Sequence, residues 1–318
     1  MRKVAFCTGI SGQVCSYLAE LLLEEGFEVH GLRRRKAVDN LDNLQGVLAH
    51  PDLHLVWGDV EDGARLAEVI MDVQPTHIFN FAAQSQVRIS FDTPAATGNV
   101  TGIAVARLLE LTKRIVPEAK FYQASSSEMY GSTPAPQSET SPMVPVSPYG
   151  AAKLYAYHLV KIYRAQGLHA TNGITFNADS PRRGTQFVTR KIVQAVARIH
   201  AGKQQNLVLG NLDAKRDWMH AKDAVRGIYD MMQLPDPVDL CIGSGETHSV
   251  EEFVDLAFKA VGKDWHDYVT FDDRLKRPTE VTVLQADCTR AKELIGWNPT
   301  YTFQTLVEEM VNAELARV

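Results

Sequence analysis

Residues 3–26 read KVAFCTGISGQVCSYLAELLLEEG, and this stretch decides the fold. The apolar run over residues 4–7 is typical of a buried strand, while leucines 18, 21 and 22 have helical spacing before a glycine stop at 26. Gly9 and Gly12 lie between the two, where a G-x-x-G turn lets backbone N–H groups and a helix N-terminus face a pyrophosphate. The stretch therefore predicts the first strand–turn–helix unit of a dinucleotide-binding fold.

The same alternation of strand and helix patterns continues through the first half of the chain. We expect strands over residues 3–8, 28–32, 53–57, 77–82, 120–125 and 169–176, and helices over 14–26, 63–73, 100–116 and 149–166. Such alternation predicts an α/β fold of the Rossmann type, a doubly wound and largely parallel sheet.

After residue 176 the pattern becomes less regular and predicts a smaller C-terminal substrate domain. Helices are expected over 187–200, 221–232, 250–261 and 303–316, and strands over 206–209 and 240–243. We assign residues 1–176 and about 212–246 to the cofactor-binding domain. Residues 177–211 and 247–318 then form the substrate-binding domain.

Composition excludes several classes of protein. A net charge of −5 gives no basic field for nucleic acid, and no segment approaches the roughly 20 apolar residues of a membrane span. The four cysteines form no C-x-x-C pair and the ten histidines no H-x-x-x-H pair, so we expect reduced thiols and no metal site. With no room for a signal peptide before residue 4, a cytoplasmic protein is expected.

The second predicted strand indicates which dinucleotide binds. A carboxylate near its end would accept the ribose 2′-OH of NAD, but this strand continues into Arg33, Arg34, Arg35 and Lys36. Guanidinium groups suit a 2′-phosphate, so NADP is favoured over NAD. A solvated basic turn is the alternative.

The motif Y-x-x-x-K, in which a lysine one helical turn away can make a tyrosine a usable base, occurs twice. Tyr149 and Lys153 lie at a predicted helix start beside a proline-rich loop, whereas Tyr157 and Lys161 lie mid-helix. The first pair is the catalytic candidate, and the second is interpreted as packing and surface.

Hydroxyl groups and a carboxylate close the predicted strand over 120–125, in YQASSSEMYG (residues 122–131). Ligands meet an α/β sheet at the carboxyl ends of its strands. Ser126 and Glu128 therefore join the candidate site, although a plain serine-rich turn is the alternative.

Together these motifs resemble the extended short-chain dehydrogenase/reductase family. Longer strings are similar to its GDP-mannose 4,6-dehydratase branch over about residues 3–310: FNFAAQSQVRISF (79–91), SPYGAAKLYAY (147–157), NADSPRRGTQFVTRKI (177–192), LGNLDAKRDWMHAKD (209–223) and RPTEV (277–281). The strings over 177–192 and 209–223 are much more specific than the generic cofactor motifs.

The resemblance implies a redox-neutral dehydration of GDP-mannose to GDP-4-keto-6-deoxy-mannose. NADP takes a hydride from C4, water is lost across C5 and C6, and the hydride returns to C6. Tyr149 would remove the 4-OH proton with Lys153 holding it in place, Ser126 would bond the 4-oxygen, and Glu128 would take the C5 proton and help expel the 6-OH. A nucleotide-sugar 4-ketoreductase or epimerase with the same Tyr/Lys pair is the alternative.

Further roles are implied residue by residue. Cofactor contacts fall on Gly9, Ile10, Gly12, Gln13, Val14, Arg34, Arg35, Asp59, Val60, Ala82, Ala83, Gln84, Ser85, Lys153 and Arg183. Nucleotide-sugar contacts fall on Ser85, Asn177, Val188, Lys191, Arg216, Arg277 and Glu280, with the two arginines suited to the diphosphate. The family also implies a homodimer or homotetramer.

The chain departs from the family pattern at Val14, Cys15, Ala37, Val38, Ala96 and Ala178. All of these positions concern cofactor binding or the neighbouring oligomer contact, and none is a proposed catalytic residue. Cys15 takes the place of a glycine that packs helix on strand, so we expect a small packing cost and no obstruction of the phosphates.

Overall fold

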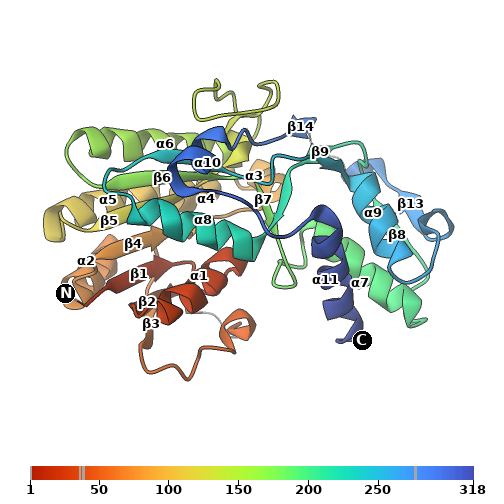
Figure 1. Ribbon diagram of the computed structural model, residues 1–318, viewed down its shortest axis with the longest axis horizontal. Coiled ribbons are helices and arrows are strands. Elements are labelled where there is room, and N and C mark those ends of the chain that lie inside the picture. Colours follow the sequence, from red (N-terminus) through yellow and green to blue (C-terminus); the bar gives the residue numbers. More distant parts are fainter. Residues whose placement is uncertain (1, 36, 38–39, 276–277) are drawn as a thin grey trace.

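The computed structural model describes residues 2–35, 37, 40–275 and 278–318. A seven-stranded sheet occupies the larger part of the molecule (Figure 1), and every strand pair in it is parallel. In spatial order the strands are β3 (Leu53–Trp57), β2 (Glu28–Arg33), β1 (Val4–Thr8), β4 (His77–Asn80), β5 (Lys120–Ser126), β6 (Ala170–Thr175) and β11 (Asp239–Ile242). The strand order reverses between β1 and β4, which is the point where ligands bind in doubly wound folds. The predicted α/β Rossmann-type fold is confirmed.

Alternation along the strands builds a core on each face of the sheet. On β1, Ala5 and Cys7 enter one core and Phe6 enters the other. The first core is covered by α1 (Gln13–Glu24), α8 (Ala221–Gln233) and α10 (Thr289–Ile295), of which α1 and α8 lie in front of the sheet in Figure 1. The second is covered by α2 (Gly63–Val73), α5 (Ala104–Ile115) and α6 (Pro148–Ala165).

The helix expected over 100–116 is longer and less regular in the structure. It is preceded by α3 (Val87–Asp92) and α4 (Pro94–Gly98) and runs through one π-helical turn, η2 (Asn99–Ile103), before α5. Pro94 at the first position of α4 explains the early start, since proline lacks only an N–H that the helix would leave unpaired.

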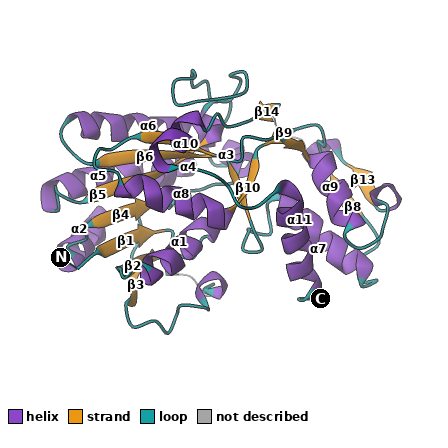
Figure 2. Cartoon of the chain, in the orientation of Figure 1, coloured by secondary structure: helices purple, strands orange, loops and turns teal. Residues whose placement is uncertain are grey.

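A separate apolar core lies in the part of the molecule that Figure 2 shows to be rich in helices. It is built by α7 (Val188–His200), α9 (Val250–Lys259) and α11 (Phe303–Leu315), with β8 (Leu207–Leu209) parallel to β13 (Val269–Phe271). Two small sheets join it to the main sheet: β7 (Asn177–Asp179) with β10 (Trp218–His220), and β9 (Lys215–Arg216) between β12 (His248–Ser249) and β14 (Val283–Leu284). Single-turn 3₁₀ helices are η1 (Asp42–Leu44), η3 (Ser127–Met129), η4 (Trp265–Asp267) and η5 (Asp273–Leu275).

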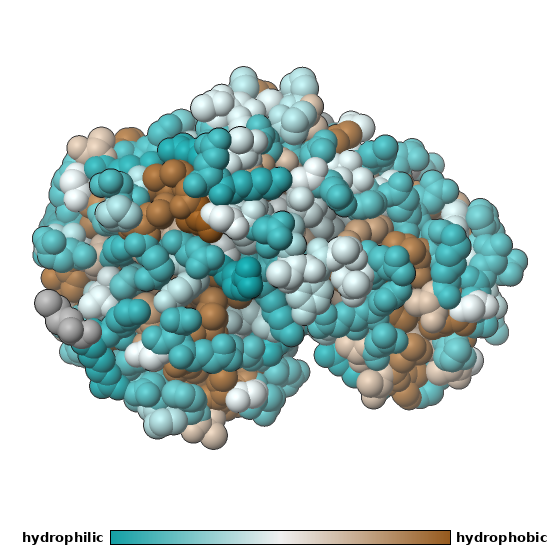
Figure 3. All heavy atoms as spheres, in the orientation of Figure 1, coloured by the Kyte–Doolittle hydropathy of each residue, from teal (hydrophilic) through white to brown (hydrophobic). Residues whose placement is uncertain are grey.

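The surface view shows a notch between the part that carries α1, β2 and β3 and the part that carries α7 and α11 (Figure 3). Hydrophilic residues cover most of this face, and hydrophobic atoms form separate groups. Of the helices that the structure describes, none has the length and apolar character to cross a membrane.

Candidate active site

The turn between β1 and α1 has the backbone geometry of a phosphate cradle. Gly9 has φ +70°, and a Cβ there would lie 3.0 Å from the Ala82 nitrogen, so both its conformation and its packing require glycine. Gly12 donates to the Gly9 carbonyl at 2.9 Å and forms the N-cap of α1. Because Gly12 has no side chain, none of its atoms covers the amide groups of the first turn.

A cavity of about 260 Å³ opens above this turn at the switch point of the sheet. Eight of the predicted cofactor residues line it: Gly9, Gly12, Arg34, Asp59, Val60, Ala82, Ala83 and Ser85. A neighbouring hollow of about 530 Å³ is lined by Arg34, Arg35, Trp57, Gly58 and Asp59. The predicted cofactor residues thus come together from the ends of β1, β2, β3 and β4.

The basic residues at the end of β2 lie in different environments. Arg33 lies with its guanidinium 3.7 Å from the centre of the Trp57 ring on β3, directly opposite in the strand register. Arg34 follows it and lines both hollows, and Arg35 lines the larger one. Lys36 and Val38 lie outside the described residues.

Other predicted cofactor residues make contacts within the protein. Ile10 is fully buried and fills the space above Gly31, where a Cβ would lie 2.5 Å from its side chain. Val14 packs against the core, and Gln84 donates to the Thr97 hydroxyl at 3.1 Å. These three side chains support the shape of the cavity.

Gln13 and Arg183 meet at the Ala178 carbonyl. The Gln13 amide donates to that oxygen at 2.8 Å and accepts from the Ser180 hydroxyl at 2.7 Å, while Arg183 donates to it at 3.0 Å. Arg183 also pairs with the buried Asp179 at 3.2 Å. The first residue of α1 is therefore tied to the segment that follows β7.

Ser126 and Glu128 lie where β5 ends and the single turn η3 begins. The Ser126 hydroxyl accepts from the Glu128 amide at 3.2 Å, an N-cap contact that fixes the turn. Glu128 is only 9% exposed. The Ser126 hydroxyl and the nearly buried Glu128 carboxylate therefore lie at the same end of the sheet as the glycine turn.

The start of α6 brings Tyr149 to the same place. Ser147 caps the helix by accepting from the Gly150 amide at 3.0 Å, and Pro148 occupies the first position. A Cβ on Gly150 would lie 2.6 Å from the Glu128 carbonyl oxygen, so the helix can approach η3 this closely only with glycine there. The glycine of the SPYG string is thus a packing requirement of the site, which the sequence analysis did not identify.

Ser126, Glu128 and Lys153, the other proposed catalytic residues, all lie around Tyr149. Burial raises the pKa of Tyr149 to about 12, a hydrogen bond with Ser126 and the charge of Arg183 lower it, and the charge of Glu128 raises it. Burial lowers the pKa of Lys153 to about 8, and its ammonium lies 5.8 Å from the centre of the Tyr149 ring. A tyrosine with hydroxyl and cationic neighbours, beside a carboxylate, can exchange protons with a bound hydroxyl group.

A chain of buried hydrogen bonds fixes the position of the Lys153 ammonium. Its Nζ donates to the Ala124 carbonyl at 2.6 Å, and the Gln123 amide donates to the same oxygen at 3.1 Å. Asn80 donates to Gln123 at 2.7 Å and accepts from the Thr8 hydroxyl at 2.5 Å. This chain crosses β5, β4 and β1. Sequence patterns missed it because Thr8 and Asn80 end their strands, Gln123 lies within β5, and only the strand pairing brings the three together.

The second Tyr–Lys pair has a different environment. Tyr157 is buried, its pKa is raised first by burial and then by the nearby Asp239 carboxylate, and Lys161 is exposed. Its ammonium lies 5.3 Å from the centre of the Tyr157 ring, at the surface of α6. The structure therefore places only Tyr149 and Lys153 beside Ser126 and Glu128.

The predicted nucleotide-sugar residues lie on the small sheets and on α7. Arg216 is 5% exposed, donates to the Val281 carbonyl at 2.8 Å and pairs with Glu280 at 2.9 Å. Asn177 on β7 is paired with Trp218, two residues after Arg216. Val188 begins α7 half-exposed, and Lys191 one turn later donates to the Val208 carbonyl at 2.6 Å. Arg277 lies outside the described residues.

The segment after residue 277 also reaches the start of α6. Thr279 donates to the Val146 carbonyl at 2.8 Å, one residue before the Ser147 cap. Arg216 and Glu280 are thereby held close to the loop that positions Tyr149.

Comparison of the sequence with known proteins shows the family to which the chain belongs. The family described as GDP-mannose 4,6 dehydratase matches residues 6–310. The chain belongs to the GDP-mannose 4,6-dehydratase family. It is 47% identical to the human GDP-mannose 4,6 dehydratase and 43% identical to the enzyme of that name from Sinorhizobium fredii, with 99% of this chain covered in both cases and 92% and 97% of those proteins.

Solved structures show the same fold at lower identity. A dTDP-glucose 4,6-dehydratase from Bacillus anthracis in complex with NAD superposes with a TM-score of 0.85 at 24% identity, covering 98% of this chain and 96% of that one. A UDP-glucose 4-epimerase from Thermus thermophilus with NAD gives 0.86 at 23% identity, covering 99% and 100%. These structures share the Rossmann-type fold of this chain.

Proposed function

We propose that this protein catalyses the NADP-dependent dehydration of GDP-mannose to GDP-4-keto-6-deoxy-mannose. The observation that carries the proposal is the position of Glu128, a nearly buried carboxylate beside the Tyr149–Ser126 pair and linked to Ser126 through its own amide. Oxidation and reduction at C4 alone need a tyrosine and a lysine. Loss of water across C5 and C6 needs a further group that takes and gives a proton at a second carbon.

The glycine turn fits a dinucleotide. A pyrophosphate suits the turn because Gly9 packs closely on the Ala82 backbone and no side chain of Gly12 covers the start of α1. The two adjoining hollows suit the nucleosides on either side of it. NADP, when bound, would accept a hydride from the sugar C4 and return it to C6. Gly9, Gly12, Asp59, Val60 and the segment 82–85 would hold it.

Arg34 and Arg35 support NADP rather than NAD. Arg34 lines both hollows at the end of β2, Arg35 lines the larger one, and Arg33 is stacked on Trp57. Two adjacent guanidinium groups provide forked donors for a 2′-phosphate. Asp59, the carboxylate in both hollows, follows β3 rather than β2, so it does not occupy the position that usually binds the ribose 2′-OH.

In the first step Tyr149 removes the proton of the sugar 4-OH while Ser126 hydrogen-bonds the same oxygen. Burial of Tyr149 opposes its ionisation, and Ser126 and Arg183 favour it. Lys153, fixed to the Ala124 carbonyl, keeps a positive charge near the tyrosine ring and orients it.

In the second step Glu128 removes the C5 proton, which the C4 ketone has acidified. The same carboxyl group then protonates the 6-OH as it leaves, so water is lost and Glu128 returns to its ionised form. Ser126 and Tyr149 hold the C4 oxygen during this exchange. Once C6 has been reduced, Tyr149 gives the proton that it took from the 4-OH to C5, so the 4-keto-6-deoxy sugar forms and Tyr149 returns to its starting form.

The diphosphate of the substrate would bind Arg216 and Arg277. The Arg216–Glu280 pair at 2.9 Å holds the guanidinium in place, and two forked donors suit the two phosphates. Asn177, Val188, Lys191 and Ser85 complete the proposed contacts. In this scheme residues 1–176 and about 212–246 form the NADP-binding domain, and residues 177–211 and 247–318 form the nucleotide-sugar-binding domain. Ser85 and Arg216 are the residues of the first domain that also contact the nucleotide sugar.

Mass spectrometry tests the reaction directly. The purified protein is incubated with GDP-mannose with and without added NADP, and the product is expected to be lighter by one water. An unchanged substrate in the presence of protein-bound NADP would contradict the proposal.

Glu128→Gln separates dehydration from 4-ketoreduction or epimerisation. Deuterium at C4 of the substrate should still transfer to the nicotinamide in the variant, because Tyr149, Lys153 and Ser126 are intact, while water loss falls by about 10²- to 10⁴-fold. Turnover that is unaffected by this substitution would favour the alternative class of enzyme.

A further inference from the structure

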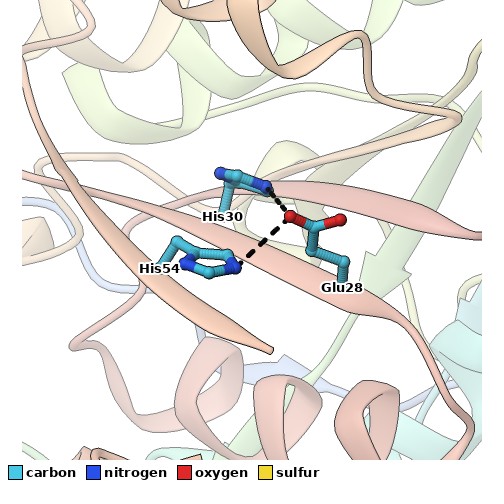
Figure 4. Close-up of side chains that lie close together, drawn as sticks. All are labelled: Glu28, His30 and His54. Carbon is cyan, nitrogen blue, oxygen red and sulfur yellow. Dashed lines mark hydrogen bonds and ion pairs between the residues drawn. The ribbon is translucent and has the colours of Figure 1, made fainter. Parts of the chain in front are cut away.

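Glu28, His30 and His54 form a cluster on β2 and β3, at one edge of the main sheet (Figure 4). The proposed catalytic residues belong to other elements, β5, η3 and α6. His30 on β2 stands directly opposite His54 on β3 in the strand register, and Glu28 precedes His30 by two residues on the same face of β2. Both imidazoles point at the same carboxylate oxygen. The cluster is built by strand pairing, which explains why a search for histidine spacing along the sequence predicted no zinc site.

The distances within the cluster match a tetrahedral metal site. The Nε2 atoms of His30 and His54 lie 3.0 and 3.3 Å from Glu28 Oε1, and one nitrogen from each histidine and this oxygen all lie within 4.8 Å of one another. Metal–ligand bonds of about 2.0–2.2 Å at tetrahedral angles place neighbouring donor atoms about 3.3–3.6 Å apart. Small side-chain rotations are therefore enough to bring the three donors around one ion.

The carboxylate is also held from its other side. Arg2 donates to Glu28 Oε2 at 2.9 Å and to Asp52 at 2.6 Å, leaving Oε1 turned toward the histidines. Such outer contacts orient a ligand group, although the arginine charge reduces the affinity for a cation. The His54 side chain is 45% exposed, so water has access to a fourth coordination position.

We infer that Glu28, His30 and His54 bind a divalent transition-metal ion, with Zn²⁺ the ion that the two imidazoles, one carboxylate and one open position suit best. The ion would join β2 to β3. Because β3 is the edge strand and is hydrogen-bonded in the sheet to β2, such a bridge would restrain the strand that ends at Trp57, beside the cofactor hollow.

Zinc titration of the full-length protein tests the inference. The protein is freed of metal with a chelator and desalted, Zn²⁺ is added in competition with a chromophoric chelator, and bound zinc is counted by elemental mass spectrometry. We expect one strong equivalent per chain. His54→Gln should weaken it by about 10- to 100-fold or more, since loss of even an outer-shell contact has an effect of that size.

His266→Gln is the matched control. His266 contacts Asp264 at 2.7 Å and is well exposed, so it offers the same histidine–carboxylate pair without a third ligand in the described residues. Zinc affinity should be unchanged in this variant. Circular dichroism of His54→Gln, whose changed side chain is half-exposed, checks that the fold is retained.

Hydrogen exchange supplies a second measurement. Zn²⁺ should slow exchange of the β2 and β3 amides in the wild type and in His266→Gln but not in His54→Gln. Equal zinc affinity in the wild type and His54→Gln, or no strong equivalent in the wild type, would overturn the inference.

Discussion

The Lys153 ammonium donates a 2.6 Å hydrogen bond to the carbonyl oxygen of Ala124. This bond joins α6 to the end of β5, the two elements that carry the proposed acid–base groups. It also connects Lys153 to the buried chain of Gln123, Asn80 and Thr8. The position of the lysine is therefore set by one backbone carbonyl and three buried polar side chains of the sheet, and it does not depend on an exposed loop.

Tyr149→Phe should lower the dehydration rate by about 10²- to 10⁴-fold, because the variant keeps the ring and loses the proton-transfer group. Tyr157→Phe is the matched control, since it makes the same change in the other Tyr–Lys pair. Tyr157 faces Asp239 in the core, so this control should lose about 1 kcal/mol of stability and keep most of its activity. Comparable rate losses in both variants would contradict the assignment of Tyr149.

Lys153 should make stability depend on pH above neutrality. Its folded pKa of about 8 lies below the ordinary value of 10.5, so the unfolded chain binds more protons between those two pH values. The burial penalty, about 3 kcal/mol, is fully present below pH 8 and disappears as the pH rises to 10.5. Lys153→Met removes this penalty.

Urea unfolding of the wild type and Lys153→Met at pH 7, 8.5 and 10 measures the effect. The wild type should gain stability relative to the variant over this range, because only the wild type releases the buried proton on folding. A constant difference between the two proteins across the range would mean that the pKa of Lys153 is not depressed.

Gly150→Ala should reduce activity although alanine normally favours a helix. The added Cβ would lie 2.6 Å from the Glu128 carbonyl oxygen, so α6 or η3 must move and the Tyr149–Glu128 geometry changes. A loss of about 10²-fold in kcat is expected for a displacement near 1 Å. Gly63→Ala, at the start of α2 with its nearest contact at 3.8 Å, should leave kcat unchanged.

Replacing Arg34 and Arg35 with alanine should weaken NADP binding by at least about tenfold and NAD binding much less. Each charge-assisted hydrogen bond to the 2′-phosphate contributes about 1.5–3 kcal/mol, and NAD lacks that phosphate. Fluorescence titration with both dinucleotides measures the ratio of affinities. An equal loss for NAD and NADP would show that the two arginines do not read the 2′-phosphate.

Cys15→Gly should leave NADP affinity within a few-fold of the wild type and lower stability by about 1–2 kcal/mol. Cys15 is 1% exposed and packs beside Cys7 beneath the turn, so glycine removes a buried sulfur and loosens the helix backbone. Thermal unfolding and dinucleotide titration separate the two effects. Abolished binding would mean that the side chain shapes the phosphate cradle itself.

The strand and helix periods predicted the main sheet closely. Strand 53–57 and helix 63–73 have the predicted bounds, and the late strand expected over 240–243 appears as β11. These segments carry strong periodic patterns because each buries one or both faces in a large core. The two-residue strands β9, β12 and β14 were not predicted, since two residues contain no period.

The candidate site was only partly predictable for a related reason. Ser126, Glu128, Tyr149 and Lys153 belong to recognisable strings. Asn80, at the end of β4, and Gln123, within β5, look like single polar residues of ordinary strands. Their hydrogen bond depends on the register of β4 and β5, in which these two residues are directly paired. Strand register also explains the His30–His54 pair and cannot be obtained from spacing along one chain.

Gln13 connects the proposed binding site of the dinucleotide with that of the nucleotide sugar. It is the first residue of α1 and follows the glycine turn. Its side chain hydrogen-bonds the Ala178 carbonyl and the Ser180 hydroxyl, which lie between Asn177 and α7. A dinucleotide that ordered the turn would therefore also order the segment proposed to contact the nucleotide sugar. Such coupling is reciprocal. If the bound dinucleotide raised the affinity for the nucleotide sugar by some factor, the bound nucleotide sugar would raise the affinity for the dinucleotide by the same factor.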